Sequence, residues 1–197
     1  TTSISNALIV AGGMGSRLGS VTKDKPKPML HIDGCPILEH CINKLEEADI
    51  KTIYISVNHM SEQIIDFIKS KTFKSEIIPI KETTKLGTIG SLYLIKKRIN
   101  YPLLVMNADL VTSLSLSTLI SFYNSENVDG VITAATYETK VPYGILKYNQ
   151  IGQLQCIEEK PTIKNLVAAG VYILNKNISD LLIKQKYIDM PELLDKA

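Results

Sequence analysis

The amino-acid sequence predicts an α/β protein with a three-layer, Rossmann-like fold, in which helices cover both faces of a mixed, mostly parallel sheet. Two observations predict this fold class. In the first half of the chain, short β-branched runs alternate with segments of helical periodicity, which is the pattern of strands joined by crossover helices. The first run, residues 7–11, is continuously small and apolar, as a strand buried on both faces of a parallel sheet requires.

The strands and helices of the first half follow in alternation. Strands are predicted over 7–11, 52–57, 76–80 and 103–106, and helices over 37–48, 64–68, 88–98 and 114–123. Gly34 permits a turn before the first helix, and Pro36 suits the first turn of that helix. Ser61 and Ser113 are the predicted N-caps of two later helices, because a serine hydroxyl accepts a hydrogen bond from a free helical amide.

The second half of the chain is richer in strands. Strands are predicted over 130–137, 144–148, 154–158 and 167–174, and helical spacing resumes only at 178–183. We expect this half to complete the sheet and to wall one side of a cleft. No linker interrupts the sequence, so residues 1–197 are predicted to form a single domain.

Length and composition limit the function. The chain has 197 residues, of which 45% are hydrophobic and 21% charged, enough to bury a core. Its net charge of +2 is too balanced for a protein that binds nucleic acid through general electrostatics. No apolar run approaches the roughly 20 residues of a membrane span, and no signal peptide opens the chain. Together with three widely spaced cysteines, interpreted as reduced thiols, this predicts a cytoplasmic protein that does not enter a membrane.

A glycine-rich turn follows the first predicted strand. Gly12, Gly13 and Gly15 let the backbone adopt positive φ and let a ligand approach the chain closely. Amides in such a turn suit a phosphate, and Arg17 and Lys27 add fixed positive charge. The sequence therefore predicts a polyphosphate cradle. The alternative is a tight strand–helix turn with solvated charges.

Two common phosphate loops do not fit this turn. The dinucleotide fingerprint G-x-G-x-x-G would need a third glycine at position 18, where Leu18 stands. The Walker loop needs a Gly-Lys-Ser/Thr triplet, which the turn lacks. What remains is G-G-x-G-x-R-L followed by K-P-K-P-M.

That pair of motifs resembles the sugar-1-phosphate nucleotidyltransferases, and the likeness covers essentially the whole chain. The resemblance implies a nucleotide site made by Ala11, Gly12, Gly13, Met14, Gly15, Ser16, Arg17, Lys27, Glu82, Gly87 and Thr88. It implies catalytic roles for Arg17, Lys27 and Asp109. The sugar phosphate already carries a nucleophilic oxygen, so the reaction demands positioning and charge neutralisation rather than a general base.

Asp109 is the predicted metal ligand. It follows an apolar strand in the sequence Asn107-Ala108-Asp109, and a carboxylate at a strand end can hold Mg²⁺ while substrate phosphates fill other positions. The alternative is an aspartate that only forms a turn. The resemblance supports the metal role, because the family carries an N-x-D motif there with aspartate as the ligand. Ala108 replaces the Gly or Ser of many members.

Glu82 is the predicted reader of the base. It stands five residues before Gly87 in a segment similar to the family's base-recognition segment. A carboxylate can accept hydrogen bonds from guanine N1–H and from its exocyclic amine, whereas a glutamine would suit uracil or thymine better. The sequence thus predicts GTP as the nucleotide, with a solvated loop glutamate as the alternative.

The resemblance also implies a sugar-phosphate site. Its expected members are Asn107, Gly144, Glu159, Lys160, Gly170 and Tyr172, with Lys160 meeting the phosphate and Glu159 the sugar hydroxyls. Many relatives have Asn where this chain has Ala168, so the sequence does not determine which sugar is bound. Glucosamine 1-phosphate and mannose 1-phosphate are the expected candidates. The three histidines, His31, His40 and His59, form no nucleophile or metal spacing, and His40 is expected to be solvated.

One family feature is missing from the sequence. Members usually supply a second metal-binding aspartate in a W-x-D-x-G-type segment, but this chain has no Trp, and Asp189 and Asp195 do not match. Since the chain also starts at Thr1 rather than Met, we expect a domain truncated at the C-terminus and excised from a longer protein. The segment Y-I-D-M-P-E-L-L resembles the bacterial branch that includes guanylyltransferases of legionaminic acid synthesis. The resemblance leaves room for a homo-oligomer and for a fused regulatory module.

Other functions stay open from the sequence. One is a uridylyltransferase or another nucleotidyltransferase acting on a sugar phosphate, because the base preference depends mainly on Glu82. The molybdenum-cofactor guanylyltransferases share a similar first loop but lack the K-P-K-P-M and L-G-T-x-G-S-L segments. A nucleotide-sugar sensor without turnover would account for incomplete metal ligation.

Overall fold

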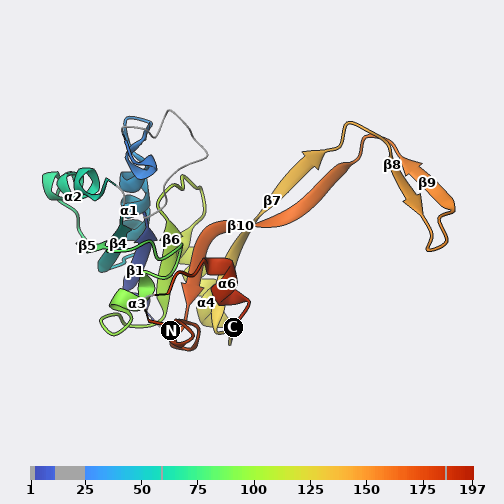
Figure 1. Ribbon diagram of the computed structural model, residues 1–197. Coiled ribbons are helices and arrows are strands. Elements are labelled where there is room, and N and C mark those ends of the chain that lie inside the picture. The colour runs from blue at the N-terminus through green and yellow to red at the C-terminus, as the bar shows by residue number, and fades with distance from the viewer. Residues whose placement is uncertain (1–2, 12–24, 59, 185) are drawn as a thin grey trace. The chain divides into compact units, whose positions relative to one another are not determined.

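A six-stranded sheet forms the centre of the protein, in the order β5-β4-β1-β6-β10-β7 (Figure 1). The structure is a computed structural model that describes residues 3–11, 25–58, 60–184 and 186–197. The strands of this sheet are β1 (Asn6–Val10), β4 (Thr52–Val57), β5 (Glu76–Lys81), β6 (Leu103–Asn107), β7 (Gly130–Lys140) and β10 (Thr162–Leu174). β1 pairs in parallel with β4 and β6, β4 pairs in parallel with β5, and β10 runs antiparallel to β6.

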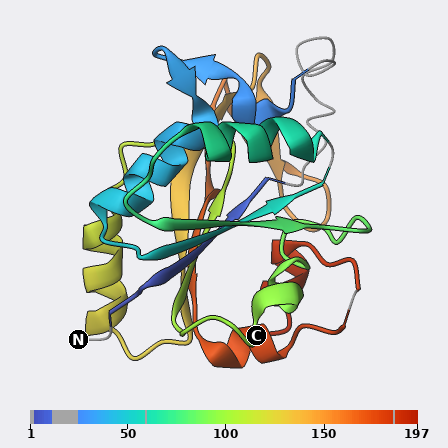
Figure 2. The same cartoon turned by 90° about the vertical axis from the view of Figure 1, so that its left-hand side faces the viewer.

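Helices cover both faces of this sheet (Figure 2). One face carries α1 (Ile37–Glu47), α2 (Ser61–Ser70) and α4 (Leu116–Ser125), and the other carries α3 (Leu92–Ile95), α5 (Lys176–Asp180) and α6 (Met190–Leu194). Strand β1 separates the two apolar layers, because Ala7 and Ile9 pack on the first side and Leu8 on the second, all fully buried. The predicted fold class, a mostly parallel sheet between two helical layers, is therefore confirmed.

Small elements complete the described chain. These are the 3-10 helix η2 (Lys27–Met29) and two hairpins, β2 (His31–Ile32) with β3 (Cys35–Pro36) and β8 (Ile145–Tyr148) with β9 (Leu154–Glu158). The β2–β3 turn confirms the predicted turn at Gly34, which has a φ of 88° next to Asp33 with a φ of 49°. Both residues adopt the left-handed region, which glycine and aspartate tolerate better than most residues.

Both predicted serine caps are wrong. Helix α4 begins two residues later than expected, and the side chain of Ser115, not Ser113, accepts the hydrogen bond from the Thr118 amide at 3.2 Å. The amide of Leu114 is already bonded to the Thr112 hydroxyl at 3.1 Å, so the chain is still in a turn there. In α2, Ser61 is the first helical residue and its hydroxyl donates to the Glu62 carboxylate rather than capping.

Several predicted boundaries also change. The helix predicted over 88–98 shrinks to α3, with turns on either side, and the helix predicted over 178–183 becomes the shorter α5. β7 and β10 each extend beyond the predicted strands 130–137 and 167–174. These differences come from long-range pairing, which local periodicity does not encode.

The chain divides into two compact units. One comprises Thr1–Ile132 with Gly170–Ala197, and the other Thr133–Ala169. The second unit contains the β8–β9 hairpin and the adjoining parts of β7 and β10, and nearly all of its side chains are exposed. Within the described ranges, no helix has the length and apolar character needed to cross a membrane.

Candidate active site

The order of the strands predicts where a ligand site should lie. The chain runs from β1 to β4 and β5 on one side, and then returns to place β6 on the other side of β1. In parallel α/β sheets, ligands bind outside the carboxyl ends of the strands at such a switch point. Here Val10 and Asn107 are register partners, and the amide of Ala108 donates to the Val10 carbonyl at 3.1 Å. The predicted residues Ala11, Asn107 and Asp109 therefore lie at one edge.

Lys27 and Asp109 meet at this edge. The Lys27 ammonium donates to the Asp109 carboxylate, forming an ion pair whose side chains are 33% and 34% exposed. Lys27 opens η2, where Pro26 and Pro28 restrict the backbone on either side. Two residues 82 positions apart thus join into one charged pair at the switch point. The structure brings together these two predicted catalytic residues.

Cys41 of α1 forms a hydrogen bond with the backbone of the turn that carries Asp109. The Cys41 thiol lies 3.3 Å from the carbonyl oxygen of Leu110, to which it donates. It is fully buried, and this burial raises the pKa of the thiol to about 11. Sequence reasoning placed Cys41 only on the apolar face of a helix, and no sequence signal linked it to the Asp109 turn.

The predicted base reader, Glu82, is buried at the end of β5. One carboxylate oxygen, Oε2, accepts hydrogen bonds from the Leu86 amide at 3.3 Å and from the Asn58 side chain at 3.5 Å. The other oxygen, Oε1, is buried without a hydrogen-bond partner among the described residues, as is the hydroxyl of Ser56. Burial raises the pKa of the Glu82 carboxyl, while the hydrogen bonds from Leu86 and Asn58 oppose that shift.

Gly87 and Thr88 follow Glu82 in the same loop, and both contact the segment just before α6. Gly87 has a φ of 82°, and a Cβ there would lie 2.3 Å from the Ile188 carbonyl oxygen. The amide of Thr88 donates to the Asp189 carboxylate at 2.8 Å. The sequence assigned Gly87 to the nucleotide site. In the structure, Gly87 makes room for a neighbouring segment of the chain.

Part of the predicted sugar site is assembled at the switch point. Gly170, with a φ of 79°, lies beside Asn107, so that a Cβ on this glycine would be 2.8 Å from the Asn107 side-chain nitrogen. Tyr172, two residues further along β10, is 7% exposed and packs in the core layer with Leu8 and Val105. Burial raises the pKa of the Tyr172 hydroxyl.

The other predicted sugar-site residues lie in the second unit. A Cβ on Gly144 would be 3.0 Å from the Glu159 carboxylate, and the Lys160 ammonium lies 3.8 Å from the same carboxylate. Both charged side chains are 69% exposed. The backbone of Lys160 is left-handed, with a φ of 45°, which is uncommon for a lysine. These three residues are therefore neighbours within their own unit.

The remaining predicted site residues lie outside the described part of the chain. They are Gly12, Gly13, Met14, Gly15, Ser16 and Arg17. The described residues contain no group of three or more His, Cys, Asp or Glu side chains that could hold a metal ion. Asp109 is a single, partly exposed carboxylate at a strand end, which fits a Mg²⁺ ion that takes its other ligands from phosphates and water.

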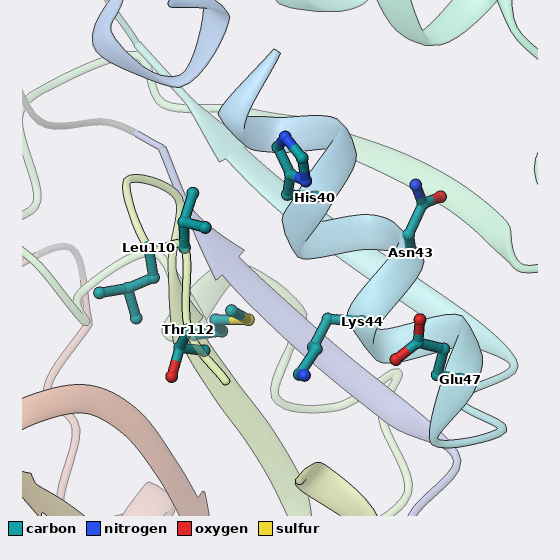
Figure 3. A pocket seen from close by; sticks show the side chains of 8 residues that line it. His40, Asn43, Lys44, Glu47, Leu110 and Thr112 are labelled. Atoms are coloured by element: carbon teal, nitrogen blue, oxygen red, sulfur yellow. The ribbon is translucent and has the colours of Figure 1, made fainter. Parts of the chain in front are cut away.

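A groove of about 260 Å³ lies between α1 and the segment after β6 (Figure 3). It is lined by His40, Asn43, Lys44, Glu47, Met106, Leu110, Val111 and Thr112, none of which the sequence assigned to a site. His40, which the sequence predicted to be solvated, is partly exposed, and its Nε2 atom lies 2.8 Å from the Ile32 carbonyl oxygen and 3.1 Å from the Cys35 sulfur.

Comparisons with known proteins agree on one family. Residues 6–196 match the family model described as nucleotidyl transferase. A mannose-1-phosphate guanyltransferase 2 from Candida glabrata is 34% identical over 185 residues, covering 89% of this chain and 51% of the relative. A putative mannose-1-phosphate guanyltransferase from Sulfolobus acidocaldarius is 28% identical over 176 residues, covering 88% and 49%. The chain therefore spans about half the length of the curated relatives it matches.

Solved structures resemble this chain as well. The crystal structure of HddC from Yersinia pseudotuberculosis complexed with GMP-PN is 30% identical, has a TM-score of 0.71, and is matched over 94% of this chain and 83% of that chain. A putative glucose-1-phosphate thymidylyltransferase from Bacillus anthracis is 20% identical, with a TM-score of 0.72 and coverage of 97% and 81%. This second likeness concerns the fold alone.

Proposed function

Because the chain belongs to the nucleotidyl transferase family, we propose that it transfers GMP from GTP to a sugar 1-phosphate. An oxygen of the sugar phosphate attacks the α-phosphorus of GTP, the bond between that phosphorus and the bridging oxygen to the β-phosphate breaks, and GDP-sugar and pyrophosphate result. The relatives named as mannose-1-phosphate guanylyltransferases and the structure solved with GMP-PN, a ligand with a GMP moiety, support guanine as the base.

The observation that carries this proposal is the Lys27–Asp109 pair at the switch point of the sheet. A cation and a carboxylate at this edge match what nucleotidyl transfer needs, since the reaction is promoted by neutralising phosphate charge and holding the reactants in line. Lys27 is proposed to stabilise the α-phosphate. Asp109 is proposed to hold Mg²⁺, which when bound neutralises charge on the phosphates.

The ion pair also has a consequence for substrate binding. In the structure, Lys27 and Asp109 neutralise each other. A metal ion held by Asp109 would free the Lys27 ammonium to donate to a phosphate oxygen. The pair therefore keeps both side chains at the site before the substrate arrives.

Base selection is proposed to depend on Glu82. Its buried carboxylate has one oxygen held by Leu86 and Asn58 and a second, Oε1, without a partner among the described residues. A buried acceptor without a donor is unfavourable, so a ligand that supplies N–H groups would be stabilised there. Guanine offers two such donors on one edge, N1–H and the exocyclic amine.

The remaining substrate contacts are also proposals. Gly12, Gly13 and Gly15 would cradle the triphosphate with their amides, and Arg17 would neutralise the departing pyrophosphate. The predicted sugar-phosphate contacts are proposed for each unit by itself: Asn107, Gly170 and Tyr172 in the first, and Gly144, Glu159 and Lys160 in the second, with Lys160 meeting the phosphate. We propose mannose 1-phosphate or glucosamine 1-phosphate as the acceptor.

The proposal is tested by measuring pyrophosphate release with GTP, UTP, CTP, dTTP and ATP, each against a panel of hexose 1-phosphates and Mg²⁺. We expect one pyrophosphate per GDP-sugar formed, and kcat/KM at least about tenfold higher for GTP than for the other nucleotides. A preference for UTP or dTTP would replace guanylyl transfer by another nucleotidyl transfer on the same fold. Nucleotide binding without turnover would indicate a sensor.

A further inference from the structure

The side chains of Asp189 and Thr88 each accept a hydrogen bond from a backbone amide of the other's segment. Asp189 stands at the N-cap position of α6, but its side chain makes no hydrogen bond to that helix. Instead its carboxylate accepts from the Thr88 amide at 2.8 Å. The Thr88 hydroxyl accepts in turn from the Met190 amide, also at 2.8 Å, and so takes over the capping of α6. Each side chain satisfies a backbone amide of the other segment.

Backbone hydrogen bonds fix the same two segments together. The amide of Ile188 donates to the Leu86 carbonyl at 3.0 Å, and the amide of Ile89 donates to the Ile188 carbonyl at 3.3 Å. We call residues 186–190 the strap and residues 82–90 the loop. The Tyr187 hydroxyl adds a hydrogen bond to the second oxygen of Asp189 at 3.0 Å, so both oxygens of this carboxylate are occupied.

The strap accounts for one glycine of the loop. A Cβ on Gly87 would lie 2.3 Å from the Ile188 carbonyl oxygen, closer than real Cβ atoms approach backbone. A Cβ on Gly90 would instead lie 2.1 Å from the Leu86 carbonyl oxygen, which belongs to the loop itself. The strap therefore fits against the loop only because Gly87 lacks a side chain.

The loop is fixed at its other end by Glu82. The Glu82 carboxylate accepts from the Leu86 amide at 3.3 Å, and Leu86 is the residue whose carbonyl the strap binds. The chain of contacts runs from Asp189 through Thr88 and Leu86 to Glu82. It therefore links the strap to the side chain that we propose reads the base.

We propose that Asp189 is a positioning residue that fixes the loop, and through it the Glu82 carboxylate, in the geometry that selects the base. This inference depends on the proposed function, because it assigns Asp189 a role in choosing GTP. Both oxygens of Asp189 are already bonded to Thr88 and Tyr187, so the proposed role is indirect. Its removal would release the Thr88 amide and the start of α6 together, and let the loop and Glu82 sample several positions.

The test compares Asp189→Ala with Asp189→Asn, which keeps an acceptor oxygen for the Thr88 amide. Glu192→Ala is the matched control, because Glu192 is a nearby carboxylate, in α6, that forms an exposed ion pair with Lys196. Affinities for GTP and UTP are measured by titration calorimetry with Mg²⁺. For turnover, the Michaelis constants for GTP and for the best sugar 1-phosphate are measured separately.

We expect Asp189→Ala to weaken GTP binding about tenfold, to bring the GTP and UTP affinities closer together, and to leave KM for the sugar phosphate within twofold. Asp189→Asn and Glu192→Ala should keep the wild-type preference for GTP. If wild-type protein prefers GTP and Asp189→Ala prefers it equally, the inference is overturned while the proposed function stands. If wild-type protein shows no preference for GTP, the proposed function fails, and the inference with it.

Hydrogen exchange on the unmodified protein tests the inference without depending on how a variant folds. If the strap and the loop form one unit, GTP should slow exchange of the Ile188 and Met190 amides as well as those of Thr88 and Ile89. GTP protection confined to the loop, with unchanged strap amides, would overturn the inference.

Discussion

At the scale of single residues, Glu82 shows how a buried charge can serve both structure and recognition. Its oxygen Oε2 closes the loop on the Leu86 amide, and Oε1 stays without a partner among the described residues. Burial raises the pKa of the carboxyl. A folded-state pKa above the unfolded one means that this group's contribution to stability is lost as pH rises through the folded pKa. The ionised carboxylate is therefore unfavourable unless a ligand donates to it.

Replacing Glu82 tests its role in base selection. We expect Glu82→Gln to lower kcat/KM for GTP about 10- to 100-fold, since hydrogen bonds to a charged acceptor contribute roughly 1.5–3 kcal/mol. Use of UTP should rise, because glutamine offers a donor as well as an acceptor. Glu76→Gln is the control, as Glu76 is an exposed glutamate on the same strand. If the ratio of kcat/KM for GTP to kcat/KM for UTP were the same in the wild type and in Glu82→Gln, the assignment of Glu82 as base reader would be contradicted.

Cys41 gives a prediction on alkaline stability. Its pKa rises from 9.0 to about 11 on folding, so between these pH values the unfolded chain loses the thiol proton before the folded protein does. The contribution of the Cys41 thiol to the free energy of unfolding should therefore be fully present below pH 9. It should fall by about 2–3 kcal/mol towards pH 11, at 1.36 kcal/mol per pKa unit.

Chemical unfolding as a function of pH measures this effect. The free energy of unfolding of Cys41→Ala should decline less steeply than that of the wild type over the same range. The slopes are compared rather than the absolute values, because the substitution also leaves a cavity. Identical slopes would show that the Cys41 thiol does not carry the effect.

At the scale of elements, the sequence was most reliable where the pattern was continuous. The apolar run 7–11 predicted β1 to within one residue, and β4 was predicted at its observed bounds. The helix expected over 88–98 failed because the strap, about a hundred residues later, packs against Gly87 and binds the backbone of Leu86 and Ile89. No local pattern contains that contact.

The candidate site also contains residues that the sequence identified and residues that it did not. The motifs identified Lys27 and Asp109 separately, and the structure adds that they are in contact. Cys41 and Asp189 were beyond sequence reasoning as supports of the site. Each acts by bonding to the backbone of a distant segment, and any residue type with a suitable donor or acceptor can do this.

The corrected cap of α4 provides a matched pair of variants. Ser115→Ala should lower the free energy of unfolding by about 1 kcal/mol, because it removes the acceptor for the Thr118 amide. Ser113→Ala, at the exposed position that the sequence favoured, should stay within about 0.5 kcal/mol of the wild type. Urea unfolding of both variants measures the difference. A larger loss of unfolding free energy for Ser113→Ala than for Ser115→Ala would show that Ser113 is the N-cap of α4.

At the scale of the whole molecule, the two units differ in how much they bury. The first has two apolar layers around β1, while in the second Leu146, Tyr148, Leu154 and Ile157 of the β8–β9 hairpin are each between 57% and 69% exposed. A two-stranded hairpin without a packed face is only marginally stable. Predicted sugar-site residues such as Lys160 therefore belong to the less protected unit.

Amide hydrogen exchange tests this difference directly. We expect the amides of β8 and β9 to exchange at least about a hundredfold faster than those of β1 and β6 in the ligand-free protein. A sugar 1-phosphate together with GTP should slow exchange around Gly144 and Glu159. Equal protection of both units without ligand would contradict this prediction.

The central claim is that nucleotidyl transfer takes place at the carboxyl edge of the sheet, where Lys27 and Asp109 meet. The most direct measurement is the rate of GDP-sugar formation by Asp109→Asn and by Asp49→Asn. Asp49 is the matched control, because it also pairs with a lysine, Lys51, but is 84% exposed, and asparagine tolerates its positive φ. We predict a loss of at least about 100-fold for Asp109→Asn and a change within twofold for Asp49→Asn. A wild-type rate in Asp109→Asn would contradict the account.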